Sequence, residues 1–236
     1  MGPSTGDRVT EPRPLRYERK FVVDALTLPE VEALVRFHPA LFSEVYPPRH
    51  VNNLYLDSPD LASYVDNLDG VRDRAKVRIR WYGDLFGLVH RPVLELKIKQ
   101  GLVGRKEAHE LPAFLIDREF DSDRLARILS GAGLSERLRH SVTTLDARLL
   151  NRYRRRYFLS SDGRVRLTMD SDLDFYRVGP RDHAFVARWR DRECTILELK
   201  YDVEHEERAA QVASRLPFRM TKNSKYVGGL EAVNLW

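Results

Sequence analysis

The segment from Arg72 to Tyr82 alternates cationic with mostly apolar residues along most of its length. Its even positions hold Arg72, Arg74, Lys76, Arg78 and Arg80, and its odd positions include Val77, Ile79 and Trp81. Side chains two residues apart point to the same side of a β-strand. The segment therefore predicts a strand with one face of cations and an opposite face that is largely apolar.

The same alternation recurs in four other segments, where charged residues again share one face. These residues are Glu95, Lys97 and Lys99; Arg164, Arg166 and Asp170; Glu198 and Lys200; and Glu18 and Lys20. A single strand of this kind is typical of a sheet with one solvated face. Cations that repeat about 7 Å apart along several strands repel one another, and this indicates an anionic ligand.

Turn residues such as Ser161-Asp162-Gly163 predict hairpins, and hence an antiparallel sheet with a few flanking helices. The expected strands are 16–23, 51–57, 72–82, 93–99, 103–111, 149–159, 164–170, 172–178 and 194–201. The expected helices are 28–37, 60–67, 124–129, 204–215 and 224–232, with Ser58 and Asn223 as N-caps. Closure of the sheet would turn the charged faces into a lumen, with the helices packed over the apolar faces outside.

Composition and length are compatible with this interpretation. We expect residues 1–14 to be a disordered leader and residues 15–236 to form one domain. The net charge of +5 says little by itself, but the pI near 9.3 makes an anionic partner plausible. The one cysteine excludes an intrachain disulfide and favours a cytoplasmic location. No run of about 18 apolar residues is present, so we expect no membrane insertion.

A lumen lined with arginine and lysine suits a linear polyphosphate, because both side chains donate to phosphate oxygens. Carboxylates in the same lumen would repel that ligand unless a divalent metal ion bridged them to phosphate. Phosphoryl transfer needs little beyond alignment, a metal ion and positive charge around the transferred group. The pattern therefore indicates a metal-dependent site for a phosphate chain.

At these residues the sequence resembles the catalytic domain of the vacuolar transporter chaperone (VTC) polyphosphate polymerases, in the CYTH-like superfamily of triphosphate tunnel metalloenzymes. The resemblance lies in an ordered set of segments from about residue 15 to the C-terminus. The segments are Tyr17-Glu18-Arg19-Lys20-Phe21, residues 76–83, Leu94-Glu95-Leu96-Lys97, Tyr153-Arg154-Arg155, residues 164–170, Leu197-Glu198-Leu199-Lys200 and residues 221–226. Arg16 stands where the wider superfamily has its first glutamate, as in the VTC branch.

This resemblance implies an α+β fold with a closed antiparallel barrel of eight strands, ATP as phosphoryl donor, and Mn²⁺ or Mg²⁺ as cofactor. By motif position, the phosphate-binding residues would be Lys20, Arg78, Arg80, Lys97, Lys106, Tyr153, Arg155, Arg166, Lys222 and Ser224. Lys225, Lys200 and Glu198 would be catalytic, and Glu198, Glu18 and Glu95 would serve the metal ion. Alternation cannot decide which of the cations from Arg152 to Arg156 faces inward, and only the resemblance selects Arg155.

Three functions remain open at this stage. The first is a polymerase that extends inorganic polyphosphate, and the preference for it rests on the resemblance. The second is a hydrolase of inorganic triphosphate or nucleoside triphosphates on the same scaffold. The third is a non-catalytic module that binds polyphosphate, inositol phosphates or RNA. Trp81 lies opposite the cations, which argues against a stacking platform for nucleic acid, and Glu198 favours catalysis over binding alone.

Overall fold

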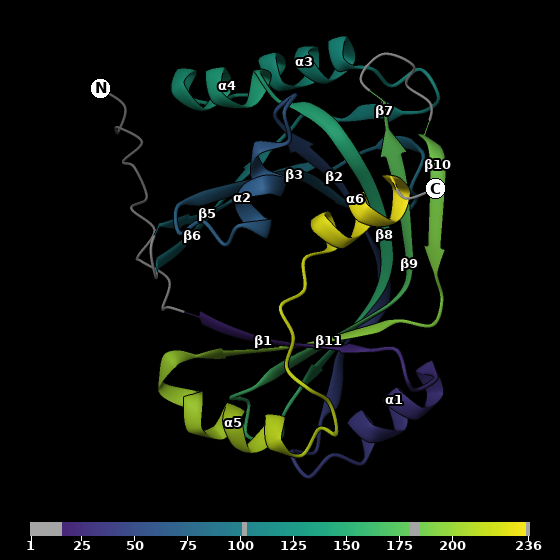
Figure 1. Cartoon of the computed structure of the whole chain (residues 1–236), viewed down its shortest axis with the longest axis vertical. Coiled ribbons are helices and arrows are strands. Elements are labelled where there is room, and N and C mark those ends of the chain that lie inside the picture. The colour runs from purple at the N-terminus through teal and green to yellow at the C-terminus, as the bar shows by residue number, and fades with distance from the viewer. Residues whose placement is uncertain (1–15, 101–102, 180–184, 235–236) are drawn as a thin grey trace, which may run out of the picture.

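A computed structural model of the chain describes residues 16–100, 103–179 and 185–234, so the expected leader lies outside the described residues. Its main feature is a nine-stranded antiparallel sheet in the order β1-β11-β9-β8-β2-β3-β5-β6, with β10 paired to β9 (Figure 1). The strands are β1 (Arg16–Val23), β2 (Ser43–Asp57), β3 (Arg74–Tyr82), β5 (Val93–Gln100), β6 (Val103–Glu110), β8 (Asp146–Leu159), β9 (Arg166–Val178), β10 (Phe185–Asp191) and β11 (Thr195–Asp202). A two-stranded sheet joins β4 (Gly87–Val89) to β7 (Phe114–Ile116).

The sheet is strongly curled, but it does not close into the barrel that the sequence predicts. Within the described residues, the path of paired strands ends at β1 on one side and at β6 on the other. Contact across this opening is made by side chains: Lys97 Nζ on β5 lies 3.4 Å from Glu18 Oε2 on β1. The expected closed barrel is therefore corrected to an open, half-barrel sheet with one concave face.

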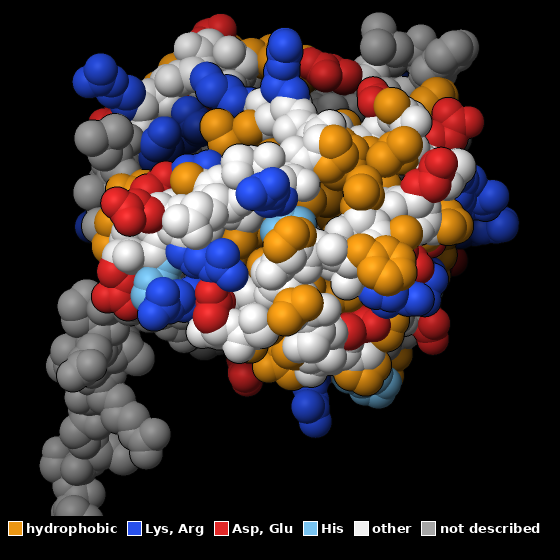
Figure 2. All heavy atoms as spheres, turned by 90° about the horizontal axis from the view of Figure 1, so that it is seen from below, with side chains coloured by type: hydrophobic (Ala, Val, Ile, Leu, Met, Phe, Trp, Pro, Cys, Tyr) orange, Lys and Arg blue, Asp and Glu red, His pale blue; other side chains and the backbone are white. Residues whose placement is uncertain are grey.

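Helices cover the convex side of the sheet, as the alternation predicts. At one end, α1 (Leu28–Arg36) and α5 (Glu206–Ser214) pack on apolar residues of β1, β9 and β11, such as Phe21 and Leu197. At the other end, α3 (Ser122–Gly131) and α4 (Glu136–Thr143) cover residues such as Ile79 and Leu94. Figure 2 views the molecule from the α1 and α5 side, where apolar side chains lie among charged ones.

The C-terminal helix α6 (Lys225–Asn234) lies instead against the concave face, in front of β8 and β9 (Figure 1). The Tyr226 ring stacks on Tyr55 of β2 at 5.2 Å between centroids, and Gly229 lies against Phe175 and Leu149. The short helix α2 (Ala62–Leu68) is its neighbour. One part of the concave face is thus filled by apolar packing, and the polar part lies beside the first turn of α6.

Several expected elements differ from the structure in extent. The segments expected at 164–170 and 172–178 form one strand, β9, which continues through Asp172 at a φ of 53°. Helix α6 begins one residue later than expected, so Ser224 rather than Asn223 precedes it, with Ser224 Oγ 3.5 Å from the Val227 amide. Helix α2 also begins later than expected, with Leu61 rather than Ser58 as its N-cap, although Ser58 Oγ accepts a hydrogen bond from the Ala62 amide at 3.0 Å. No helix in the described part of the chain has the length and apolar character needed to cross a membrane.

Candidate functional site

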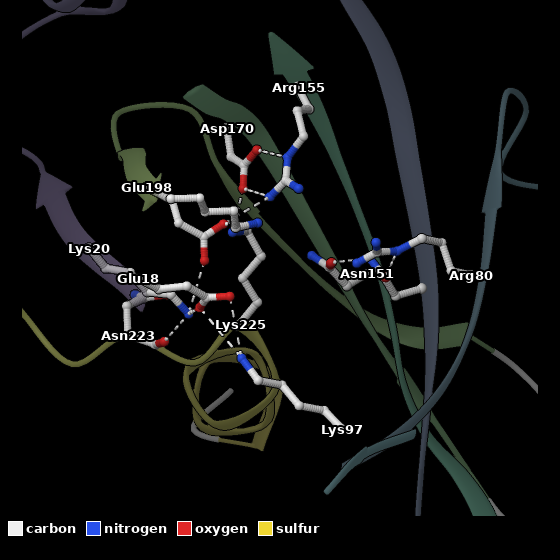
Figure 3. A network of polar contacts seen from close by, with 12 residues as sticks. Glu18, Lys20, Arg80, Lys97, Asn151, Arg155, Asp170, Glu198, Asn223 and Lys225 are labelled. Atoms are coloured by element: carbon white, nitrogen blue, oxygen red, sulfur yellow. Dashed lines mark hydrogen bonds and ion pairs between the residues drawn. The ribbon is translucent and has the colours of Figure 1, made fainter. Parts of the chain in front are cut away.

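Asp170, on the concave face of β9, lies at the centre of a buried ion-pair cluster (Figure 3). The Arg155 guanidinium donates to both of its oxygens, at 2.5 and 2.7 Å, and Lys225 Nζ donates to Oδ2 at 2.6 Å. Burial favours a neutral Asp170, but the charges of Arg155 and Lys225 outweigh it and hold the pKa of this carboxyl below its ordinary value. Asp170 therefore stays ionised and fixes two cations on the inner face.

Glu198 on β11 is the second buried carboxylate of the cluster and has three cationic neighbours. Its oxygens lie 2.9 Å from Lys200 Nζ, 3.4 Å from Lys20 Nζ and 3.8 Å from Arg155 Nη2. Burial acts to raise the pKa of Glu198, yet these cations bring it well below its ordinary value. The side chain is thus an anionic oxygen ligand at neutral pH, which is the state that a hard divalent cation requires.

Glu95 on β5 is held by cations from two neighbouring strands. Arg78 donates to Oε2 at 2.7 and 2.8 Å, whereas Lys106 reaches Oε1 at 2.7 Å and Arg80 lies 3.5 Å from it. Burial opposes ionisation of this carboxyl, but the arginines and Lys106 bring its pKa down to about 2. Both oxygens of Glu95 are therefore engaged by the protein itself.

A chain of buried asparagines orients Arg80. Arg80 Nε donates to Asn53 Oδ1 at 3.1 Å, and Asn53 Nδ2 donates to Asn151 Oδ1 at 3.2 Å (Figure 3). Asn151 Nδ2 donates in turn to the backbone carbonyl of Asp174 at 3.2 Å. Sequence reasoning missed these residues, although the adjacent Asn52 and Asn53 inside an expected strand were a usable signal, because buried amides need partners.

The start of α6 brings backbone and side-chain oxygens to the edge of the cluster. Lys76 Nζ donates to Ser224 Oγ at 2.9 Å, and Lys20 Nζ donates to the Asn223 carbonyl at 3.4 Å. Burial, together with the charge of Lys20 and other nearby cations, lowers the pKa of Lys76 to about 8. Lys76 and Asn223 were not among the expected site residues, whereas Ser224 was.

The structure gathers most of the expected residues on the concave face. Ion pairs connect seven cations there to carboxylates that include Glu18, Glu95 and Glu198, and the Lys20–Glu18 pair is 3.5 Å long. The cations are Lys20, Arg78, Arg80, Lys106, Arg155, Lys200 and Lys225. The Tyr153 ring lies beneath Arg155 and Lys225, at 5.1 and 4.7 Å from its centroid. Cations outnumber carboxylates in this cluster, so its net charge is positive.

Three expected residues lie at or beyond the edge of the cluster. The Lys97 side chain is 63% exposed, and its ion-pair partner in the described part of the chain is Glu18. Arg166, which is exposed, pairs with Lys200 in the register of β9 and β11, and Lys222 is exposed on the segment before α6. Arg155 faces inward, whereas Arg156 points outward and forms ion pairs with Glu32 and Glu44.

A divalent metal ion fits only part of this carboxylate set. Among the described residues, no group of three acidic, histidine or cysteine side chains is arranged to hold one. Glu95 and Asp170 have both oxygens held by cations at 2.8 Å or less, whereas Glu18 and the Oε1 atom of Glu198 have their ion-pair contacts at 3.4 to 3.5 Å. Magnesium is commonly held by one or two carboxylates together with substrate phosphates and water. The donor set therefore fits an ion that phosphate oxygens help to coordinate.

Comparison with solved structures finds chains with low sequence identity. A proposed adenylate cyclase from Vibrio parahaemolyticus is 12% identical, with 92% of this chain and 98% of that chain covered, at a TM-score of 0.49. A protein from Pyrococcus horikoshii is 13% identical, with 91% and 96% covered and a TM-score of 0.47. A proposed adenylyl cyclase from Hippeastrum, described as having a dominant triphosphatase activity, is 16% identical, with 89% and 93% covered and a TM-score of 0.46.

No curated protein matches the chain significantly. The sequence profile of the VTC domain, however, matches residues 15–234. That range contains every strand that contributes a charged side chain to the concave face, as well as all of α6. The chain therefore belongs to the VTC domain family.

Proposed function

We propose that this protein is a metal-dependent polyphosphate polymerase, which transfers the γ-phosphate of ATP to the end of an inorganic polyphosphate chain on the concave face. One observation carries the proposal: a cluster of inward cations retains a net positive charge after its carboxylates have been paired. Like charges held together in a partly buried site are unfavourable without an anion. Membership of the VTC domain family supports the same reaction class.

A triphosphate would bind on the concave face, beside the cations whose charge the carboxylates do not fully neutralise. Arg155 and Lys225 are already oriented by Asp170, and Arg80 is oriented by Asn53. These cations would meet the phosphate oxygens without a large loss of side-chain freedom, because the protein has ordered them in advance. Asp170 would act as a positioning residue and would not contact the substrate.

The metal ion would be Mn²⁺ or Mg²⁺, held by Glu198 with Glu18 as a second carboxylate. When bound, it would neutralise charge on the phosphate oxygens and polarise the phosphoryl group under attack. Lys20 and Lys200 lie between 2.9 and 3.5 Å from these carboxylates, and they would repel a bare cation. We therefore expect the ion to bind together with the triphosphate rather than before it.

The transfer itself needs no general base from the protein. A terminal oxygen of the polyphosphate chain is already anionic and would attack the γ-phosphorus, while the bond to the β–γ bridging oxygen breaks and ADP leaves. The developing charge lies on the equatorial and leaving oxygens. Lys225 and Arg155 are the cations best placed to stabilise it, since both lie beside Tyr153 with side chains only 13% and 10% exposed.

A triphosphatase is the second candidate, and the position of α6 favours it. This helix fills the concave face over β8 and β9, where Gly229 lies against Leu149 and Phe175. A long chain would have to leave by another route, whereas a short triphosphate would not. In this alternative, water attacks the same phosphorus and inorganic phosphate is released.

The test is incubation of the protein with ATP and either Mn²⁺ or Mg²⁺, followed by separation of the products on a gel and by assay of free phosphate. We expect long polyphosphate chains from the wild type and none from Glu198→Gln. Free phosphate without chains would replace the polymerase by the triphosphatase. Absence of turnover with both metals would contradict both reactions.

A further inference from the structure

Three tyrosines surround one arginine on the concave face, beside the cation cluster. The Arg49 guanidinium lies 5.7 Å from the ring centroid of Tyr46, 4.9 Å from that of Tyr82 and 4.8 Å from that of Tyr157. The rings of Tyr46 and Tyr157 also meet edge to face at 5.8 Å. We call these four residues the tyrosine cluster. Such cation–π contacts orient the rings and the guanidinium together.

The sheet register places the tyrosine cluster next to the proposed phosphate site. Arg49 on β2 pairs with Arg155 on β8, the arginine that Asp170 orients. Tyr157 lies two residues beyond Arg155 on the same face of β8, and it pairs with Thr168, which pairs with Glu198. Because neighbouring strands lie about 4.8 Å apart, Tyr157 and Glu198 are separated by about 10 Å at the backbone.

The tyrosine cluster presents aromatic surface to solvent on this inner side. Tyr46 is 57% exposed and Tyr82 is 51% exposed, whereas Tyr153, deeper on the same face, is 1% exposed. Tyr82 shares its face with Arg78 and Arg80, so it is the aromatic residue of β3 that lies with the cations rather than opposite them. The cation cluster therefore has a stacking surface at its border.

A buried hydroxyl between the two regions lacks a partner. Thr168 is 7% exposed, and its Oγ1 has no hydrogen-bond partner in the described part of the chain. It lies in register between Tyr157 and Glu198. A buried hydroxyl without a partner raises the free energy of the protein by roughly the value of one lost hydrogen bond. Thr168 therefore points to a polar group that a ligand supplies at this position.

We propose that the tyrosine cluster binds the nucleoside end of a nucleoside triphosphate whose phosphates lie in the cation cluster. The base stacks on the exposed rings of Tyr82 and Tyr46, and Arg49 and Thr168 offer donors to the ribose or the α-phosphate. This inference rests on the proposed function, which names ATP as the donor, and it adds the place where the nucleoside binds. Because every base has a π-face, stacking alone gives little discrimination, and ATP and GTP should bind similarly.

The test compares the dissociation constants of ATP and of inorganic triphosphate by calorimetry, at fixed salt and without metal so that no turnover occurs. Tyr82→Ala should raise the dissociation constant of ATP roughly five- to hundredfold, which is the effect of losing one stacked base. The dissociation constant of inorganic triphosphate should be unchanged. Tyr82→Phe should retain ATP affinity, because the ring remains. Tyr17→Ala is the matched control: Tyr17 is 48% exposed, but it lies at an odd position of β1, outside the cluster.

The outcomes separate this inference from the function on which it rests. A wild-type protein that binds neither ligand would overturn the proposed function itself. If the wild type binds inorganic triphosphate, but Tyr82→Ala weakens both ligands equally or neither, the nucleoside site is wrong and the phosphate site stands. The inference requires that Tyr82→Ala selectively loses ATP affinity and that Tyr82→Phe retains it.

Discussion

Arg155 and Asp170 form a two-point ion pair between adjacent strands, with Nε–Oδ1 and Nη2–Oδ2 distances of 2.5 and 2.7 Å. Their Cα atoms are direct partners in the register of β8 and β9, so the pair is set by the sheet itself. Lys225 from α6 shares the same carboxylate at 2.6 Å. This one buried anion therefore joins the sheet to the C-terminal helix and orients two of the cations proposed to hold phosphate.

Asp170→Asn should lower the free energy of unfolding by about 3–5 kcal/mol, since it leaves two buried cations without their anion. Inorganic triphosphate should then raise the melting temperature more in the variant than in the wild type, because the ligand supplies the missing negative charge. Thermal unfolding with and without triphosphate measures both effects. The control is Glu206→Gln, which removes the half-exposed partner of Arg19 and should change stability far less. Equal stability of Asp170→Asn and wild type would show that the pair does not hold the site together.

Lys76 should couple triphosphate binding to proton uptake near pH 8.5. Its pKa of about 8 means that much of the unliganded protein carries a neutral amine at this pH. A bound polyanion favours the charged amine and raises that pKa, so binding takes up a proton. Calorimetry in two buffers with different ionisation enthalpies measures this uptake directly.

Lys76→Met is the matched variant for this measurement, because it keeps the length of the side chain without the amine. The proton uptake of the wild type should exceed that of Lys76→Met at pH 8.5, and the two proteins should agree at pH 6.5, where the amine is already charged. Any proton exchanged by the triphosphate itself is common to both proteins and cancels in this comparison. The same uptake in both proteins at pH 8.5 would assign the proton to another group.

Two adjacent glycines in α6 should respond in opposite ways to alanine. A Cβ at Gly229 would lie 2.5 Å from Phe175 Cδ1 and 2.6 Å from Leu149 Cδ2, whereas at Gly228 it would meet nothing within 4 Å. Gly229→Ala should destabilise the protein by about 1–3 kcal/mol and weaken triphosphate binding, because the displaced helix moves Lys225. Gly228→Ala should stabilise it by about 0.5–1 kcal/mol through helix propensity. Denaturant unfolding ranks the two variants, and the opposite ranking would mean that α6 does not pack against the concave face.

Glu198→Gln should keep the fold and lose metal-dependent turnover. The amide removes a charge from the site, so metal-free affinity for inorganic triphosphate should stay the same or increase. Turnover assays with Mn²⁺, together with metal-free calorimetry, separate the two effects. Glu204→Gln is the exposed control on η1 (Val203–His205). Full turnover by Glu198→Gln would remove this residue from the metal site.

Outside β8, the alternation of charged and apolar residues was sufficient to predict which faces point inward. Strand β1 has the bounds expected from the sequence, and the even residues of β3 face the concave side. Both follow from the period of two in a strand. Helix α4, in contrast, was missed, because Leu138 and Val142 are its only apolar residues and Val142 is the only one of its residues that is fully buried.

The pairing inside the site could not be predicted from the sequence. Glu95 meets Arg78 and Lys106 because β5 pairs with both β3 and β6 in one particular register, which depends on the whole sheet. The inward cation in the run around Tyr153 is likewise set by a register shift between Arg152 and Arg154. The concave packing of α6 depends on Gly229, and closure of the sheet fails where β1 and β6 are left unpaired with each other in the described residues.

The central claim is that the concave face holds the phosphate chain, and the most direct test is a crystal structure of the protein with inorganic triphosphate. We expect the phosphates to lie between Arg78, Arg155 and Lys225, with the site closed on one side by the start of α6. Triphosphate bound only on the convex surface, or absent at saturating concentration, would contradict the account.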